Sequence, residues 1–204
     1  NMRMNVAKQR KAVGGYYASV AYMDAQVGKV MAALKNAGIV DRTIVIFTSD
    51  HGYHLGEHDF WAKVSLHEES VRVPLIISVP GQKPAICDSF TELLDLYPTL
   101  SSLCGLDIPN RLQGKDISGM LSDPTLQVRE TAFTVNGRGF LLRDLDWAYI
   151  QYAEDASKGI ELFDMHKDPL QYTNLASDPN YAEIVTGFKK QLKMKLAAVR
   201  NNDL

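Results

Sequence analysis

The chain has 204 residues, of which 46% are hydrophobic and 23% are charged, as in an ordinary globular protein. This composition excludes collagen-like, low-complexity and intrinsically disordered chains. Lys and Arg number 22 and Asp and Glu number 24, so the formal net charge is −2 and no strong positive field attracts nucleic acid. The apolar runs are far shorter than the roughly 18 residues of a membrane-spanning helix. We therefore expect neither a nucleic-acid partner nor a membrane span.

The first part of the sequence predicts one helix and two strands. Apolar residues recur at intervals of three and four over residues 16–36, and Gly38 follows at a C-cap position. Continuous apolar runs at 43–47 and 73–79 indicate strands covered on both faces, as in a parallel sheet. Two such strands are too few for a sheet of usual width. We therefore expect the C-terminal part of a larger α/β domain, with an exposed apolar face where it is incomplete.

The middle of the chain predicts a short helix and then an extended segment. Asp95 stands at the N-cap of a helix over 96–104, with Pro98 in its first turn, where a missing N–H is tolerated. Glycine and proline are frequent over the next twenty residues, which indicates a linker rather than a regular element.

The last part of the sequence predicts a small antiparallel sheet and a helix. Asn136-Gly137 separates two short strands and is a strong hairpin signal. Further strands are expected at 147–152 and 160–163, and a final amphipathic helix follows Asp178-Pro179. The change of pattern predicts two domains, an incomplete α/β domain over 1–125 and a small α+β subdomain over 126–204.

Chemistry-bearing residues follow directly after the first predicted strand, in the segment Ser49-Asp50-His51-Gly52. In open α/β sheets, ligands gather at the carboxyl ends of strands, so an oxygen from Asp50 and a nitrogen from His51 are well placed for a metal ion. The segment alone leaves a second interpretation open, in which Asp50 caps a turn and His51 is a surface side chain.

The loop that follows is long and rich in ionisable residues. Four of the five histidines of the chain fall between Asp50 and His67, which favours a metal or anion site, although each of the later three has an alternative structural role. Lys63 lies in the same loop, where a cation can neutralise charge on a leaving oxygen. The neighbouring glutamates and arginine also fit a local ion-pair network that holds the loop: Glu57, Glu68, Glu69 and Arg72.

These residues resemble the second half of a type I sulfatase, with iduronate-2-sulfatase as the nearest subgroup. The similarity lies in the run from Thr48 to Lys63 and in Glu68-Glu69 with the apolar run after it. Further similar segments begin at Tyr16-Tyr17, at Leu94 and at Glu161, so the resemblance extends along nearly the whole chain. It implies an alkaline phosphatase-like α/β fold and the hydrolysis of sulfate esters, including those of sulfated polysaccharide.

The resemblance also implies roles for four residues. Asp50 and His51 match ligands of a divalent cation, calcium in members of the family, and Lys63 matches the lysine that contacts the substrate sulfate. Tyr53 stands where iduronate-2-sulfatase-like enzymes place an aromatic residue of the substrate pocket, although the residue type differs. Proteins of this type are commonly exported, periplasmic or lysosomal.

The nucleophile of the family has no counterpart in the sequence. Sulfatases use a formylglycine made from the first residue of a Cys/Ser-x-Pro-x-Arg motif, and none of the eight prolines here lies in that context. The nearest match, Asp107-Ile-Pro-Asn-Arg111, has Asp at the nucleophile position. We therefore expect the formylglycine in a missing N-terminal half of the same protein, and expect the isolated chain to bind metal weakly and to be inactive.

Two other functions remain open. A phosphodiesterase or phosphonate ester hydrolase of the same superfamily also has an Asp-His pair after a strand, and zinc, which imidazole suits better than calcium, is then the expected metal. A non-catalytic fragment or subunit that needs a partner chain is the third interpretation.

Overall fold

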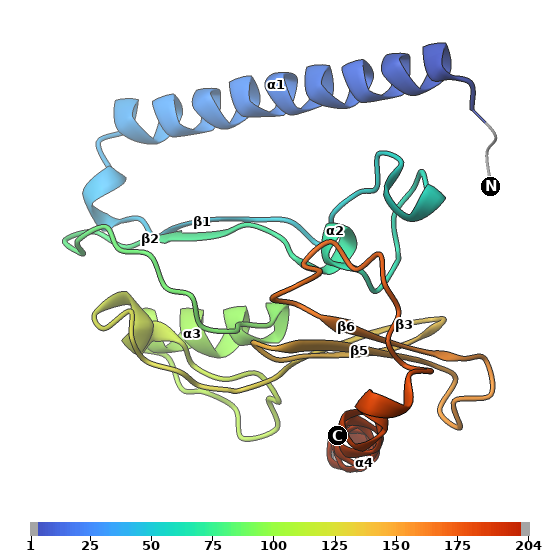
Figure 1. Ribbon diagram of the computed structural model, residues 1–204. Coiled ribbons are helices and arrows are strands. Elements are labelled where there is room, and N and C mark those ends of the chain that lie inside the picture. Colours follow the sequence, from blue (N-terminus) through green and yellow to red (C-terminus); the bar gives the residue numbers. More distant parts are fainter. Residues whose placement is uncertain (1–3, 201–204) are drawn as a thin grey trace. The chain divides into compact units, whose positions relative to one another are not determined.

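The computed structural model describes residues 4–200, which form two compact units, each described by itself (Figure 1). The first unit contains the described residues up to Val64 together with Glu69–Gln82. The second contains Ser65–Glu68 and the described residues from Lys83 onward. The units thus divide near residue 82, whereas the sequence pattern predicts a boundary at residue 125. The two divisions rest on different criteria, contacts within the chain for the units and a change of sequence pattern for the boundary at residue 125. The boundary therefore stays a prediction.

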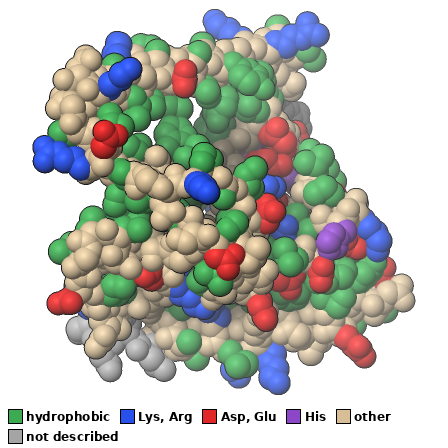
Figure 2. Space-filling view, turned by 90° about the vertical axis from the view of Figure 1, so that its left-hand side faces the viewer, with side chains coloured by type: hydrophobic (Ala, Val, Ile, Leu, Met, Phe, Trp, Pro, Cys, Tyr) green, Lys and Arg blue, Asp and Glu red, His purple; other side chains and the backbone are tan. Residues whose placement is uncertain are grey.

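The first unit opens with the long helix α1 (Val6–Asn36). It begins ten residues before the predicted start at Tyr16, because the side chain of Asn5 caps it by accepting a hydrogen bond from the N–H of Lys8 (3.0 Å). No residue of α1 is fully buried, and hydrophobic side chains are visible on the surface of this unit in the space-filling view (Figure 2). Neither α1 nor any other helix within residues 4–200 combines the length and apolar character that crossing a bilayer requires.

Strands β1 (Val45–Thr48) and β2 (Leu75–Ser78) form a two-stranded antiparallel ribbon. Val45 lies opposite Ser78 and Thr48 lies opposite Leu75. The prediction of a parallel pair was therefore wrong. A continuous apolar run identifies a strand, but it carries no information on the direction of the neighbour. Residues of β1 are half-buried, and those of β2 alternate between half-buried and exposed.

The second unit is built on a four-stranded antiparallel meander with the order β3-β4-β5-β6. Its strands are β3 (Ala132–Asn136), β4 (Gly139–Arg143), β5 (Trp147–Tyr152) and β6 (Ile160–Asp164). The helix α4 (Ala182–Arg200) packs against this sheet (Figure 1). The predicted antiparallel sheet and C-terminal helix are confirmed.

The core of the second unit lies between the sheet and α4. Every third or fourth residue of the helix is buried there, as its apolar periodicity predicts. The core residues are Leu142, Tyr149 and Leu162 from the sheet, and Val185, Phe188, Leu192 and Leu196 from the helix.

Helix α3 (Leu96–Leu103) also belongs to the second unit. Asp95 lies at its N-cap, as predicted, but its side chain makes no capping bond to α3. The carboxylate accepts hydrogen bonds from the N–H groups of Glu92 (2.7 Å) and Lys115 (2.8 Å) and forms a two-pronged ion pair with Arg129. This fully buried carboxylate therefore ties together three segments that are distant in sequence.

The remaining helix, α2 (Glu68–Val71), is a single turn directly before β2. Its residues from Glu69 onward belong to the first unit, where they contact the segment that follows β1.

Candidate metal and sulfate site

The segment Asp50-His51 begins two residues after the last residue of β1, as predicted. The side chain of Asp50 is 84% exposed, and its Oδ2 lies 3.6 Å from Nε2 of His51. Its other oxygen, Oδ1, accepts a hydrogen bond from the backbone N–H of His51 (3.0 Å). One oxygen of this carboxylate thus caps the turn, and the carboxylate as a whole remains largely exposed.

The imidazole of His51 is oriented by the backbone. Its Nδ1 lies 2.9 Å from the carbonyl oxygen of Gly52. A carbonyl oxygen only accepts hydrogen bonds, so Nδ1 carries the proton and Nε2 of the neutral ring carries a lone pair. Metal-binding histidines are commonly held in this way, with the second ring nitrogen donating to a carbonyl. Nε2 of His51 and Oδ2 of Asp50 therefore present two adjacent electron-pair donors, which fit a divalent cation.

Gly52 fixes the backbone beneath these two side chains. Its N–H donates to the carbonyl oxygen of Ser70 (2.9 Å), which joins the segment to α2. A Cβ at this position would lie 1.9 Å from the carbonyl oxygen of Glu69, so only glycine allows this approach. The hydroxyl of Ser49 donates to the carbonyl oxygen of His51 (2.8 Å) and restrains the same turn.

The two donors alone do not complete a metal site. Within residues 4–200 no group of three or more His, Cys, Asp and Glu side chains is arranged to hold an ion. Calcium takes six to eight oxygen ligands. The described part of the chain therefore offers a fraction of a coordination sphere.

Tyr53 follows the pair and packs on the helix α1. Its ring stacks on that of Tyr16, with centroids 5.6 Å apart and an interplanar angle of 30°. The side chain is 42% exposed, so part of the ring faces solvent. The residues Tyr16 and Tyr53 thus join α1 to the segment that carries Asp50 and His51, a link that sequence spacing does not reveal.

Lys63 is exposed and comes at the end of a loop that begins at Tyr53. Two backbone hydrogen bonds close this loop on itself, from His54 N–H to the Ala62 carbonyl (2.8 Å) and from Gly56 N–H to the Phe60 carbonyl (3.1 Å). The first of these bonds brings the residue before Lys63 next to the start of the loop. The side chains of Asp50 and His51 thus lie next to each other. Lys63 is linked to them through the backbone of the loop.

The other histidines of the region have structural partners. His54 is fully buried, with its ring 5.1 Å from that of Phe60. Nε2 of His58 lies 3.4 Å from Oε1 of Glu69, and Nε2 of His67 lies 3.2 Å from Oε2 of Glu161. These contacts agree with the structural role that the sequence leaves open for the three histidines. Their partners, which lie 11 and 94 residues away, follow from tertiary structure alone.

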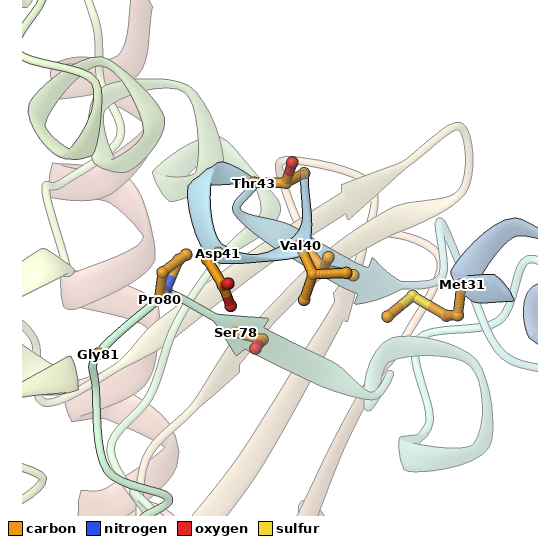
Figure 3. A pocket seen from close by; sticks show the side chains of 8 residues that line it. Met31, Val40, Asp41, Thr43, Ser78, Pro80 and Gly81 are labelled. Atoms are coloured by element: carbon orange, nitrogen blue, oxygen red, sulfur yellow. The ribbon is translucent and has the colours of Figure 1, made fainter. Parts of the chain in front are cut away.

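A separate cavity of about 430 Å³ lies at the other end of the β1-β2 ribbon (Figure 3). Val45 and Ser78, which line it, pair at the end opposite to Thr48. Among the described residues that line it, Asp41 alone is charged, and its negative charge would repel a sulfate or phosphate group. This cavity does not belong to the Asp50-His51 site.

Comparison with protein families gives two matches that together cover nearly the whole chain. The model described as "Sulfatase" matches residues 3–106. The model described as "N-sulphoglucosamine sulphohydrolase, C-terminal" matches residues 56–199. Both the Asp50-His51 segment and Lys63 fall inside the first match.

Curated relatives include arylsulfatase K of Mus musculus, which is 34% identical over 192 residues, covering 87% of this chain and 34% of the relative. Choline-sulfatase of Rhizobium meliloti is 33% identical over 182 residues, covering 86% of this chain and 34% of the relative. The chain thus spans about a third of the length of these curated relatives.

Solved structures show the same fold. A putative sulfatase from Bacteroides thetaiotaomicron matches with a TM-score of 0.87 at 26% identity, covering 97% of this chain and 45% of the other. A protein in complex with its substrate D-glucosamine-2-N,6-O-disulfate matches with a TM-score of 0.78 at 27% identity, over 92% and 41%. The phosphonate monoester hydrolase of Agrobacterium radiobacter matches with a TM-score of 0.79 at 30% identity, over 90% and 41%.

These neighbours have the alkaline phosphatase-like α/β fold, so the predicted fold class is confirmed. The family matches cover half of the chain and more, and they agree with the resemblance carried by the residues around Asp50 and Lys63. The chain therefore belongs to the sulfatase family.

Proposed function

We propose that this chain contributes to a sulfuric ester hydrolase, with Asp50 and His51 as ligands of a divalent cation and Lys63 as a contact of the substrate sulfate. The observation that carries the proposal is the pair of adjacent donors after β1, in which the Gly52 carbonyl fixes His51 in the ligating tautomer. The sulfatase family match over these residues supports the same role.

A bound cation supplies positive charge that stabilises anionic oxygens during hydrolysis. In this proposal the chain binds the cation and contributes a second positive charge, that of Lys63. Asp50 and His51 orient two ligand atoms from one rigid turn, and calcium is the expected ion. Lys63 provides an ammonium group that offsets negative charge on the sulfate oxygens or on the leaving oxygen.

A sulfated sugar is the substrate class that we propose. One structural neighbour binds D-glucosamine-2-N,6-O-disulfate as its substrate, and one family match is to the C-terminal part of N-sulphoglucosamine sulphohydrolases. The half-exposed ring of Tyr53 offers a face on which a sugar can stack. Iduronate-2-sulfatase-like specificity, predicted from the sequence, is the finer form of this proposal. The relatives reported above carry other names, arylsulfatase K and choline-sulfatase.

The formylglycine nucleophile belongs to the same proposal. No Cys/Ser-x-Pro-x-Arg motif occurs within the 204 residues. We expect that the nucleophile and the remaining metal ligands lie in an N-terminal half of the same protein, outside these 204 residues, and complete the site described here. The 204-residue chain alone is then inactive.

Phosphonate monoester hydrolysis is the second candidate, favoured by the match to the Agrobacterium radiobacter enzyme. Both reactions place an anionic tetrahedral group beside a cation and a lysine, so the residues of this chain do not separate them. The discriminating property is the rate on each substrate.

The experiment compares three p-nitrophenyl substrates on the complete natural protein: the sulfate, a phosphonate monoester and a phosphodiester. We expect the largest kcat/KM for the sulfate, and a larger kcat/KM for a sulfated sugar than for p-nitrophenyl sulfate. Preference for the phosphonate would establish the second candidate instead. Chelation followed by reloading with Ca²⁺ or Zn²⁺ identifies the ion, and the isolated 204-residue chain serves as the inactive control.

A further inference from the structure

The loop from Tyr53 to Lys63 is held at its base by main-chain bonds. His54 N–H donates to the Ala62 carbonyl, and Gly52 N–H donates to the Ser70 carbonyl of α2. The first bond closes the loop, and the second fixes the strand end from which it starts. Beyond these bonds lies the tip of the loop, which contains the short 3₁₀ turn Glu57–Asp59 and is bracketed by the bond from Gly56 N–H to the Phe60 carbonyl (3.1 Å).

Backbone hydrogen bonds close the tip on itself, from Asp59 N–H to the Gly56 carbonyl (3.1 Å) and from Phe60 N–H to the Glu57 carbonyl (3.0 Å). A side-chain pair then places the tip next to α2. Nε2 of His58 lies 3.4 Å from Oε1 of Glu69, and the two side chains are only 15% and 17% exposed. The His58 ring also packs edge-on against the buried ring of His54, at 5.7 Å between centroids. Both side chains are thus largely shielded from water, and Nε2 of His58 faces Oε1 of Glu69 at 3.4 Å without forming a hydrogen bond.

The backbone at the tip adopts a conformation that needs such support. His58 and Asp59 have φ angles of 54° and 55°, in the left-handed region that most side chains avoid. Strained positions of this kind persist where the surroundings hold them, and they cluster near functional sites. Here the His58–Glu69 contact lies between the strained turn and the helix whose Ser70 carbonyl accepts from Gly52 N–H.

We propose that the His58–Glu69 pair positions Lys63 relative to Asp50 and His51. A short series of contacts links the pair to Lys63. Phe60 follows the tip and packs on the ring of His54. The carbonyl of Ala62, the residue before Lys63, accepts a hydrogen bond from His54 N–H. Glu69 and Ser70 are adjacent, so one turn of α2 holds both the Lys63 loop and the Gly52 backbone. The proposal rests on the proposed function of Lys63, and His58 and Glu69 act through that residue.

The test is a double-mutant cycle on the complete natural protein, read as kcat/KM for sulfate-ester hydrolysis. Glu69→Gln removes the charge with little change of shape, and His58→Asn removes the ring while keeping a residue that tolerates the left-handed backbone. We expect each to lower kcat/KM about tenfold, because small misplacements of a catalytic group are costly. In a Lys63→Ala background the same changes should have almost no effect.

The control is His166→Asn, which removes the histidine of an exposed pair with Asp146 in the second unit. It should leave kcat/KM unchanged in both backgrounds. Equal losses from Glu69→Gln with and without Lys63 would overturn the proposal, because the pair would then act independently of the lysine.

A second readout does not depend on activity. Amide hydrogen exchange of the 204-residue chain reports directly on the bond from His54 to Ala62. Glu69→Gln should speed exchange at His54 at least tenfold, while His166→Asn leaves it unchanged. Unchanged protection in Glu69→Gln would refute the positioning role even if the sulfatase proposal holds. Faster exchange in a protein without sulfatase activity would refute the proposed function and retain the role of the pair in fixing the loop.

Discussion

At the scale of single residues, His51 and Gly52 define the candidate site through their backbone. The Gly52 carbonyl sets the tautomer of His51, and the Gly52 N–H ties the turn to Ser70. The side-chain donors of the site therefore depend on a close backbone approach that no other residue type permits.

Gly52→Ala tests this dependence. The added Cβ would lie 1.9 Å from the Glu69 carbonyl oxygen, so α2 or the turn has to move and the bond to Ser70 is lost. We expect the free energy of unfolding to fall by about 1–3 kcal/mol, as for other backbone strain. Urea unfolding of the 204-residue chain measures it.

Gly28→Ala is the matched control, because nothing lies within 4 Å of its added Cβ in the interior of α1. Alanine is the better helix former, so this change should stabilise the chain by up to about 1 kcal/mol. Similar destabilisation by both substitutions would show that Gly52 has no special packing role.

Asp95 and Arg129 form a second arrangement that is decided by individual residues. Burial by itself raises the pKa of Asp95, but hydrogen bonds from Arg129 and from the Lys115 and Glu92 N–H groups outweigh it and lower the pKa below the ordinary value. The charged form of Asp95 therefore stabilises the folded chain.

Asp95→Asn should lower the free energy of unfolding at pH 7 by about 3 kcal/mol, since the buried Arg129 loses its two-pronged carboxylate partner and keeps the longer contact with Glu92 (3.7 Å). The folded-state pKa lies below the unfolded one, so the contribution of the carboxylate is complete above about pH 4–5 and is lost as the pH falls further. Urea unfolding of both proteins from pH 7 to pH 3 measures the difference between them. A difference that stays constant over this range would contradict the assignment.

The sequence predicts Asp50, His51 and Lys63 as site residues, because their spacing is local and matches a family pattern. It did not identify the partners of His58, His67 or Asp95. Glu69, Glu161 and Arg129 lie 11, 94 and 34 residues away, and folding alone decides which carboxylate meets which cation. The tautomer of His51 likewise depends on the geometry of one carbonyl.

At the scale of elements, local patterns predicted the second unit well. Strand β5 has the predicted bounds, and the buried face of α4 consists of residues that its periodicity marks as apolar. The hairpin turn differs by one residue. Asn136 ends β3, and its side chain accepts hydrogen bonds from the N–H groups of Arg138 (2.8 Å) and Gly139 (3.1 Å).

The first unit was predicted less well. The direction of β2 relative to β1 and the start of α1 both differ from expectation. Pairing direction is a property of two strands together, and a side-chain cap at Asn5 extends α1 through a segment with weak apolar periodicity.

The core between the sheet and α4 predicts how two substitutions in α4 change the free energy of unfolding. Leu192 is 1% exposed between α4 and the sheet, whereas Met194, two residues on, is 64% exposed. Leu192→Ala should lower the free energy of unfolding by about 2–5 kcal/mol, because it removes apolar contacts and leaves a cavity. Met194→Ala should change it by less than about 0.5 kcal/mol. Chemical denaturation that shows equal effects for the two would place α4 away from the core.

At the scale of the whole molecule, the chain is a sulfatase-family polypeptide whose two units each hold part of the family pattern. The candidate site lies in the first unit, and the packed sheet–helix core lies in the second. The family is secure from the sequence because its motifs are spread along the chain. The choice of substrate cannot be predicted in the same way, since it depends on the residues that line a complete pocket.

The most direct test of the central claim compares Lys63→Ala with Lys83→Ala in the complete natural protein, with sulfate release and melting temperature measured together. Both lysines are exposed, so neither substitution should change the melting temperature appreciably. The proposed sulfate contact predicts a fall in kcat/KM of about 10²–10³-fold for Lys63→Ala, typical of losing one group that stabilises developing charge, and no change for Lys83→Ala. Full activity in Lys63→Ala, or a loss matched by unfolding, would contradict the account.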